Sequence, residues 1–174
     1  MARTVQAESR RSVLLMPRRS PFSQIFICKV TKKQRIFTTF VPNYYDTLRR
    51  MIEIGLKHTS DLTVTDAVTA IQMGSGDMPV LATPAMLALM ENAAMLAVAD
   101  ELPEGCTTVG GHIVSSHLKP SKIGDKVSAT AEVTKVDGKK IEFKVSAYSG
   151  DALLGDGTHL RFIVDRERFM SKLG

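Results

Sequence analysis

Glu91 is the residue whose setting points most directly to chemistry. It lies in a segment, residues 80–99, where 16 of 20 residues are apolar and only Thr83, Pro84, Glu91 and Asn92 interrupt the run. A lone carboxylate among such neighbours is expected to be desolvated, which makes it a candidate general base or nucleophile. The structural alternative is a core glutamate paired with Asn92, with a backbone amide or with a second subunit.

Thr83 is the second candidate, at the start of the same segment. Its hydroxyl is a permitted helix N-cap, and Pro84 after it is favoured at the first helical position. A residue there also lies beside free backbone amides and the positive end of the helix dipole, where a developing oxyanion or a carboxylate is stabilised. Its hydroxyl could therefore orient Glu91 or a water molecule, or accept an acyl group.

Distance limits how Thr83 and Glu91 could cooperate. Thr83 and Glu91 are eight positions apart, which in one straight helix is about 12 Å, so their side chains cannot touch. Direct contact needs Thr83 in a loop that folds back, residues from two chains across an interface, or a bridging water or substrate.

The remaining candidates lie in a strand-like segment over residues 107–118. Gly110 and Gly111 interrupt it, which indicates close approach of another backbone or a ligand, and an exposed amide there could stabilise an oxyanion. A bulge without function explains these glycines equally well. His117 stands near the end of the segment, where a histidine is ordinarily a surface or capping residue.

The elements that must position these residues can be predicted from periodicity. Residues 80–99 are apolar on every side, so the helix they predict must be covered by other elements. Tight turns are expected at Asp137-Gly138 and at Gly150-Asp151. Strands are predicted over residues 52–66, 107–118, 126–136, 140–147 and 152–165. An α+β fold in which an antiparallel sheet wraps around one long central apolar helix satisfies this order.

Composition excludes several classes of protein. With 174 residues, 44% hydrophobic and 24% charged, the chain has the composition of one globular domain and not of a collagenous, disulfide-framed or disordered protein. Its two cysteines form no framework, zinc pattern or CxxC pair, which favours a reducing compartment. No phosphate loop, dinucleotide fingerprint or metal motif is present. Seven alanines and the carboxylate of Glu91 argue against residues 80–99 as a membrane span.

Charge is distributed unevenly along the chain. Residues 1–50 hold 11 Lys/Arg against two acids, and the remainder holds 12 against 16, which predicts a basic extension over 1–50 and a domain over 51–174. Three interpretations of the extension stay open: a mitochondrial-type transit segment, a basic arm for nucleic acid or anionic lipid, and a non-native extension upstream of Met51. Nucleic-acid binding is the weakest, because no aromatic-interleaved motif accompanies the arginines.

Three separated motifs give the chain a resemblance to a known family. They are ATPAMLALMENAA with Thr83 and Glu91, GGHIVSSHLKP with His117, and GDGTHLRFIVDRERF near the end. Over about residues 51–170 the chain resembles hotdog thioesterases, and it is similar in particular to the fluoroacetyl-CoA thioesterase family. The resemblance implies a hotdog fold, a thioester hydrolase acting on a small acyl-CoA, and a homodimer with active sites at the subunit interface.

The resemblance also implies roles for individual residues. The catalytic threonine, glutamate and histidine of the family fall on Thr83, Glu91 and His117, and the glycine at the acyl carbonyl falls on Gly110, with Gly111 beside it. The chain departs from the family before Thr83, where lid phenylalanines favour the fluorinated substrate. Here that segment reads AIQMGSGDMPVLA, and no phenylalanine occurs between Phe40 and Phe143. Selectivity for fluoroacetyl groups is therefore not expected, whereas thioester hydrolysis is.

Thioester hydrolysis needs a nucleophile or base, an orienting partner and backbone donors for the oxyanion. CoA is expected as part of the substrate, with no bound cofactor and no metal, and Lys119 and Lys122 are candidate contacts for its phosphates. A cytoplasmic location is expected, or a mitochondrial one if residues 1–50 are a transit segment. One alternative function is a hotdog protein that binds acyl-CoA or a related ligand without turnover. A hotdog dehydratase is a third option, disfavoured because the sequence lacks an Asp/His pair in a hydratase-type motif.

Overall fold

The computed structural model describes residues 52–174. The predicted basic extension and its boundary with the domain lie outside these residues. The described part contains the strands β1 (Lys57–Thr63), β2 (Cys106–His117), β3 (Lys126–Asp137), β4 (Lys140–Ser149) and β5 (Ala152–Asp165). Its α-helices are α2 (Thr83–Ala97) and α3 (Arg166–Met170), with the short 3-10 helices η1 (Asp66–Val68) and η2 (Ala99–Glu101).

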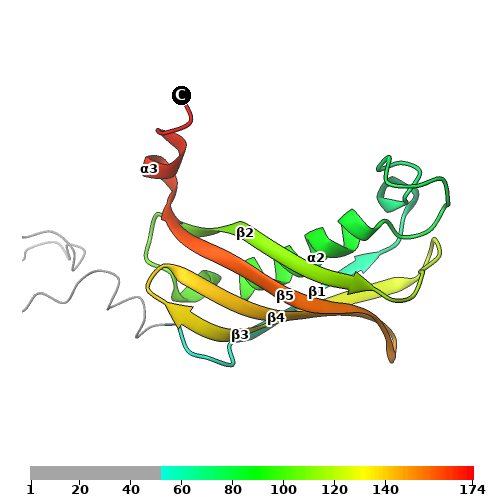
Figure 1. The fold of residues 1–174 in the computed structure, drawn as a ribbon, viewed down its shortest axis with the longest axis horizontal. Coiled ribbons are helices and arrows are strands. Elements are labelled where there is room, and N and C mark those ends of the chain that lie inside the picture. Colours follow the sequence, from blue (N-terminus) through cyan, green and yellow to red (C-terminus); the bar gives the residue numbers. More distant parts are fainter. Residues whose placement is uncertain (1–51) are drawn as a thin grey trace, which may run out of the picture. The chain divides into compact units, whose positions relative to one another are not determined.

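All five strands form one antiparallel sheet in the order β1-β3-β4-β5-β2, so β1 and β2 are its edges. Figure 1 shows α2 lying along one face of the curved sheet, with α3 beyond the end of β5. This is the predicted antiparallel sheet around one helix. No helix within residues 52–174 is long and apolar enough to cross a membrane.

The central strands follow the alternation that the sequence predicts. Alternate residues over 127–133 of β3 and 141–147 of β4 face α2 and are almost completely buried, and these residues are Val127, Ala129, Ala131, Val133, Ile141, Phe143, Val145 and Ala147. Gly138 and Gly150 follow β3 and β4 with φ of 58° and 56°, a backbone conformation that glycine adopts without steric cost. The two predicted turns are therefore present, and they fix the register of the meander.

The helix differs from its prediction in two respects. Ala82 is the N-cap residue of α2 and Thr83 is already inside the first turn, with no side-chain cap, so Thr83 is not the N-cap. The helix is also not buried on every side, because the sheet covers only the face formed by Ala85, Met86, Leu89, Met90, Ala93 and Ala94. Thr83, at the start of the helix, and Ala88 and Leu96 further along it are exposed.

Strand β5 turns two polar side chains toward the helix. His159 and Arg161 are buried, at 2% and 6% exposed, whereas Phe162 between Arg161 and Ile163 is 38% exposed on the other face. The partner strand β2 carries a bulge between Gly110 and His112, where the pairing with β5 shifts by one residue. This inward polar pair and this bulge form the surroundings of Glu91.

Candidate active site

The start of α2 and the end of β2 bring Thr83 and His117 together. Their Oγ1 and Nδ1 atoms are 2.8 Å apart and form a hydrogen bond. The other ring nitrogen of His117, Nε2, is buried and has no hydrogen-bond partner in the described part of the chain. Thr83 itself is exposed. The pair therefore combines an accessible hydroxyl with an imidazole that could take its proton or that of a water molecule.

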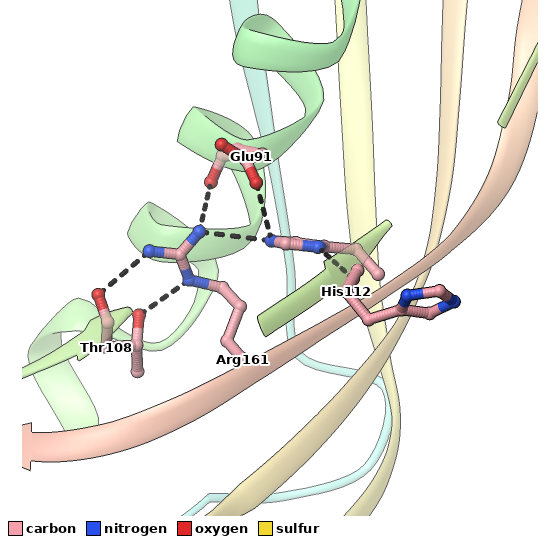
Figure 2. A network of polar contacts seen from close by, with 5 residues as sticks. Glu91, Thr108, His112 and Arg161 are labelled. Atoms are coloured by element: carbon pink, nitrogen blue, oxygen red, sulfur yellow. Dashed lines mark hydrogen bonds and ion pairs between the residues drawn. The ribbon is translucent and has the colours of Figure 1, made fainter. Parts of the chain in front are cut away.

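Glu91 lies two turns further along α2, in a separate polar cluster (Figure 2). Its Oε1 is 3.6 Å from Nε2 of His159. A Cβ placed on Gly110 would come within 2.9 Å of the same Oε1. The carboxylate thus lies against the bare backbone of β2 on one side and against an imidazole from β5 on the other.

Arg161 is the fixed centre of this cluster. Its Nε donates to the hydroxyl of Thr108 and its Nη2 to the carbonyl of Thr108, both at 2.8 Å. Its Nη1 donates to Nε2 of His159 at 3.1 Å and, at 3.4 Å, to the main-chain carbonyl of Glu91. Burial lowers the pKa of Arg161 from its usual value and the negative charge of Glu91 opposes this shift. A guanidinium ion retains its proton in proteins, so Arg161 supplies a fixed positive charge beside Glu91.

His159 is held in one orientation by β2 and by Arg161. Its Nδ1 lies 2.8 Å from the carbonyl of His112, which can only accept, so Nδ1 carries the proton. Nε2 faces a guanidinium that can only donate, so Nε2 is an acceptor. Burial, assisted by the positive charge of Arg161, lowers the pKa of His159 below the ordinary value of 6.5. The imidazole is therefore neutral at pH 7.

The structure does not form a direct triad of Thr83, Glu91 and His117 within one chain. Thr83 and His117 share a hydrogen bond, whereas Glu91 contacts His159 and the backbone at Gly110. The carboxylate is also not desolvated as expected, since 43% of its side chain is accessible. The reason is that Glu91 lies at the border of the helix face that the sheet covers. The chain therefore carries two separate groups of candidate residues.

The other predicted site residues differ in position. Gly110 adjoins Glu91, whereas a Cβ on Gly111 would collide with the ring of Phe162. Lys119 and Lys122 follow β2 and are exposed. Within residues 52–174 no cluster of His, Cys, Asp or Glu could hold a metal ion.

Sequence reasoning missed His159, Arg161 and Thr108. On β5 the apolar residues Leu160, Phe162 and Val164 alternate with His159 and Arg161, and such alternation ordinarily places the apolar set in the core. The buried set is instead His159, Arg161 and Ile163. Both polar residues lie within the third family motif, GDGTHLRFIVDRERF. That position was the signal from which a functional role for them could have been predicted.

Comparison with known proteins agrees with this architecture. The model of the family described as fluoroacetyl-CoA-specific thioesterase matches residues 64–167. A fluoroacetyl-CoA thioesterase from Streptantibioticus cattleyicolor is 36% identical over 94 residues, which is 54% of this chain and 68% of that protein. A solved structure of a fluoroacetyl-CoA thioesterase superimposes with a TM-score of 0.66 at 31% identity, covering 70% of this chain and 95% of the other.

A more distant structure has the same fold. A thioesterase superfamily member from Thermus thermophilus superimposes with a TM-score of 0.65 at 25% identity, covering 70% of this chain and 90% of the other. The single helix along a curved antiparallel sheet, together with these likenesses, places the chain in the class of hotdog-fold thioesterases, as the sequence predicted. More narrowly, it belongs to the fluoroacetyl-CoA-specific thioesterase family.

Proposed function

We propose that this protein hydrolyses the thioester of a small acyl-CoA to the free acid and CoA. The observation that carries the proposal is the contact between Glu91 and Gly110. Because Gly110 has no side chain, the carboxylate Oε1 lies directly against the backbone of β2. This brings a nucleophile or base next to a backbone segment that could donate to an oxyanion. Membership of a thioesterase family agrees with that chemistry.

The cleavage can be written with these groups in two ways. In one, the Glu91 carboxylate takes a proton from water while the water oxygen attacks the acyl carbon. In the other, the carboxylate attacks the acyl carbon and water later hydrolyses the resulting anhydride. In both, an oxyanion forms at the former carbonyl, the carbon–sulfur bond breaks and the thiolate of CoA receives a proton. We assign Thr83 and His117 to orienting water or substrate and to carrying the proton.

We propose a small acyl group without selectivity for fluorine. The segment between η1 and α2 holds Gly74, Gly76 and Asp77, and it has no phenylalanine to close over an acyl group. The apolar side chains of this segment, Ile71, Met73 and Met78, are exposed. This segment therefore offers no bulky aromatic side chain that could discriminate between acetyl and fluoroacetyl groups.

We further propose that the functional unit is a homodimer. Strand β2 is a sheet edge and carries both Gly110 and His117, and an edge strand can pair with the same strand of a second copy. Antiparallel pairing of two β2 strands centred between Ile113 and Val114 would set His117 of one subunit opposite Gly110 of the other. Thr83 and His117 from one chain would then complete a site with Glu91 from its partner.

The remaining assignments follow from sequence position. Exposed Lys119 and Lys122 follow His117 closely, and we propose them as contacts for CoA phosphates. We propose residues 51–174 as the catalytic domain, with residues 1–50 not needed for turnover. A chain with two cysteines and a CoA substrate fits a reducing compartment, and we propose the cytoplasm.

The test is thiol release from a panel of acyl-CoAs. Wild-type protein should turn over short acyl-CoAs, and a chain beginning at Met51 should do the same. Glu91→Ala and His117→Ala should each lose at least about a hundredfold in kcat, as expected for loss of an acid–base group. The matched controls Glu132→Ala and His58→Ala change exposed residues of β3 and β1 and should retain activity. Binding of CoA without any thiol release would refute the enzyme and leave a ligand-binding protein.

A further inference from the structure

The environment of His159 Nε2 places two groups of opposite charge around one lone pair. Arg161 Nη1 lies at 3.1 Å and donates to it. Glu91 Oε1 lies at 3.6 Å, where a carboxylate cannot form a hydrogen bond with a nitrogen that carries no proton. The imidazole has no accessible side-chain surface, so water does not separate these groups on its side. Adding one proton to Nε2 would therefore change its contacts with both Arg161 and Glu91.

We propose that His159 is a positioning residue that acts through Glu91. In its neutral form it fixes Arg161 beside Glu91 and leaves Oε1 free to face Gly110. In its protonated form it draws Oε1 into an ion pair and away from substrate. This inference rests on the proposed function, because it assigns to Glu91 the attack or proton removal described above.

The two states differ in their hydrogen bonds. When His159 is neutral, Nδ1 donates to the His112 carbonyl and Nε2 accepts from Arg161. When Nε2 gains a proton, it can no longer accept from Arg161, and two cations face each other in a buried site. The new N–H then points toward Glu91 Oε1, the carboxylate nearest to it. Because a charge-assisted bond is stronger than a neutral one, the carboxylate is held at the imidazole.

The ionisable groups facing His159 come from three elements. Arg161 on β5 and the imidazole of His112 on β2 disfavour the cation, and Glu91 on α2 favours it. The carbonyl of His112 holds Nδ1 as a donor in both states. Loss of activity on acidification should therefore begin below pH 6.5, and the neutral form should operate at physiological pH.

The first experiment reads the imidazole itself in the full-length protein. Imidazole 15N chemical shifts distinguish a neutral ring protonated at Nδ1, a neutral ring protonated at Nε2 and the cation. We expect the Nδ1–H form at pH 7, with titration only below pH 6.5, and a further lowered pKa of His159 in Glu91→Gln because a favourable negative charge is removed. A cation or an Nε2–H form at pH 7 would overturn the proposal.

The second experiment compares kcat/KM against pH for wild type and His159→Gln. Glutamine can accept from Arg161 through its amide oxygen but does not titrate. We expect His159→Gln to stay within about tenfold of wild type at pH 8, and below pH 6 the wild type should lose up to about tenfold more per pH unit than the variant. His58→Gln, the same change at an exposed strand position, should retain the wild-type profile.

Two kinetic outcomes contradict the proposal. Parallel acid limbs in wild type and His159→Gln would assign the titration to another group, and an equal loss at every pH would show a merely structural role. The nitrogen spectrum does not depend on turnover. A protein that hydrolyses no thioester therefore refutes the proposed function, while the state of His159 is still decided by its shifts.

Discussion

The separation of Thr83 and His117 from Glu91 leads to a sharp prediction about mixed dimers. Gly110 and His117 are seven residues apart on β2, which is about 23 Å at 3.3 Å per residue, and Thr83 and Glu91 are about 12 Å apart along α2. If each active site takes Thr83 and His117 from one chain and Glu91 from the other, two inactive variants should complement each other. The variants are Glu91→Ala and His117→Ala.

The expected magnitude follows from twofold symmetry. Random mixing of equal amounts gives half mixed dimers, and each mixed dimer has one complete site and one doubly defective site. The mixture should therefore recover about one quarter of wild-type activity, against about one hundredth or less for either variant alone. The two variants, carrying different affinity tags, are unfolded together in urea, refolded and assayed by thiol release, and the mixed dimer is then isolated through both tags.

The matched control combines two variants of the same half of the site. Thr83 and His117 are hydrogen-bonded within one chain, so mixing Thr83→Ala with His117→Ala should give no gain beyond the average of the two. If Glu91→Ala and His117→Ala also fail to complement in a mixed dimer, Glu91 acts with His117 of its own chain and the proposed interface is wrong.

Three further predictions concern single residues. Gly110→Ala places a methyl group 2.9 Å from Glu91 Oε1, so kcat should fall at least about tenfold while the melting temperature changes little, because the flexible carboxylate moves aside. Thr108→Val removes the acceptor for Arg161 Nε and should lower the free energy of unfolding in urea by about 1–3 kcal/mol, because a buried donor is left unsatisfied; an unchanged midpoint would contradict this. Burial lowers the pKa of His159 in the folded state, so the unfolded chain takes up that proton first and stability should decline as pH falls below 6.5. Urea titrations of wild type and His159→Gln at about pH 7.5 and about pH 5.5 should show a smaller decline in the variant.

The fold was predictable from sequence because its signals are local. The meander of β3, β4 and β5 is specified by the alternation within β3 and β4 and by the glycines at the two turns. These signals do not depend on which element packs against the sheet. The helix was predictable for the same reason. An entirely apolar segment, however, does not reveal which of its faces the sheet will cover. The expected desolvation of Glu91 was wrong on that account, since Glu91 lies at the border of the covered face.

The site was predictable only in part, because its contacts are long-range. The length of the helix already indicated that Thr83 and Glu91 could not touch, and the structure agrees. The hydrogen bond between Thr83 and His117 joins residues 34 apart in sequence, and no local pattern encodes it. The orientation of β5 was not predictable from alternation, since burying His159 and Arg161 is favourable only where Thr108 and the His112 carbonyl satisfy them.

The extra residue in β2 changes which side chains of that strand share a face. In a regular strand, residues an odd number apart point to opposite faces, so Gly110 and His117 would lie on opposite sides of the sheet. The bulge between Gly110 and His112 resets this alternation, and both positions face α2, one at Glu91 and the other at Thr83. A one-residue phase shift therefore lets a single strand contribute to two distant parts of the same face. Deleting Gly111 would remove the bulge and leave Gly110 and His117 an even number of residues apart in a regular strand, so both would still face α2.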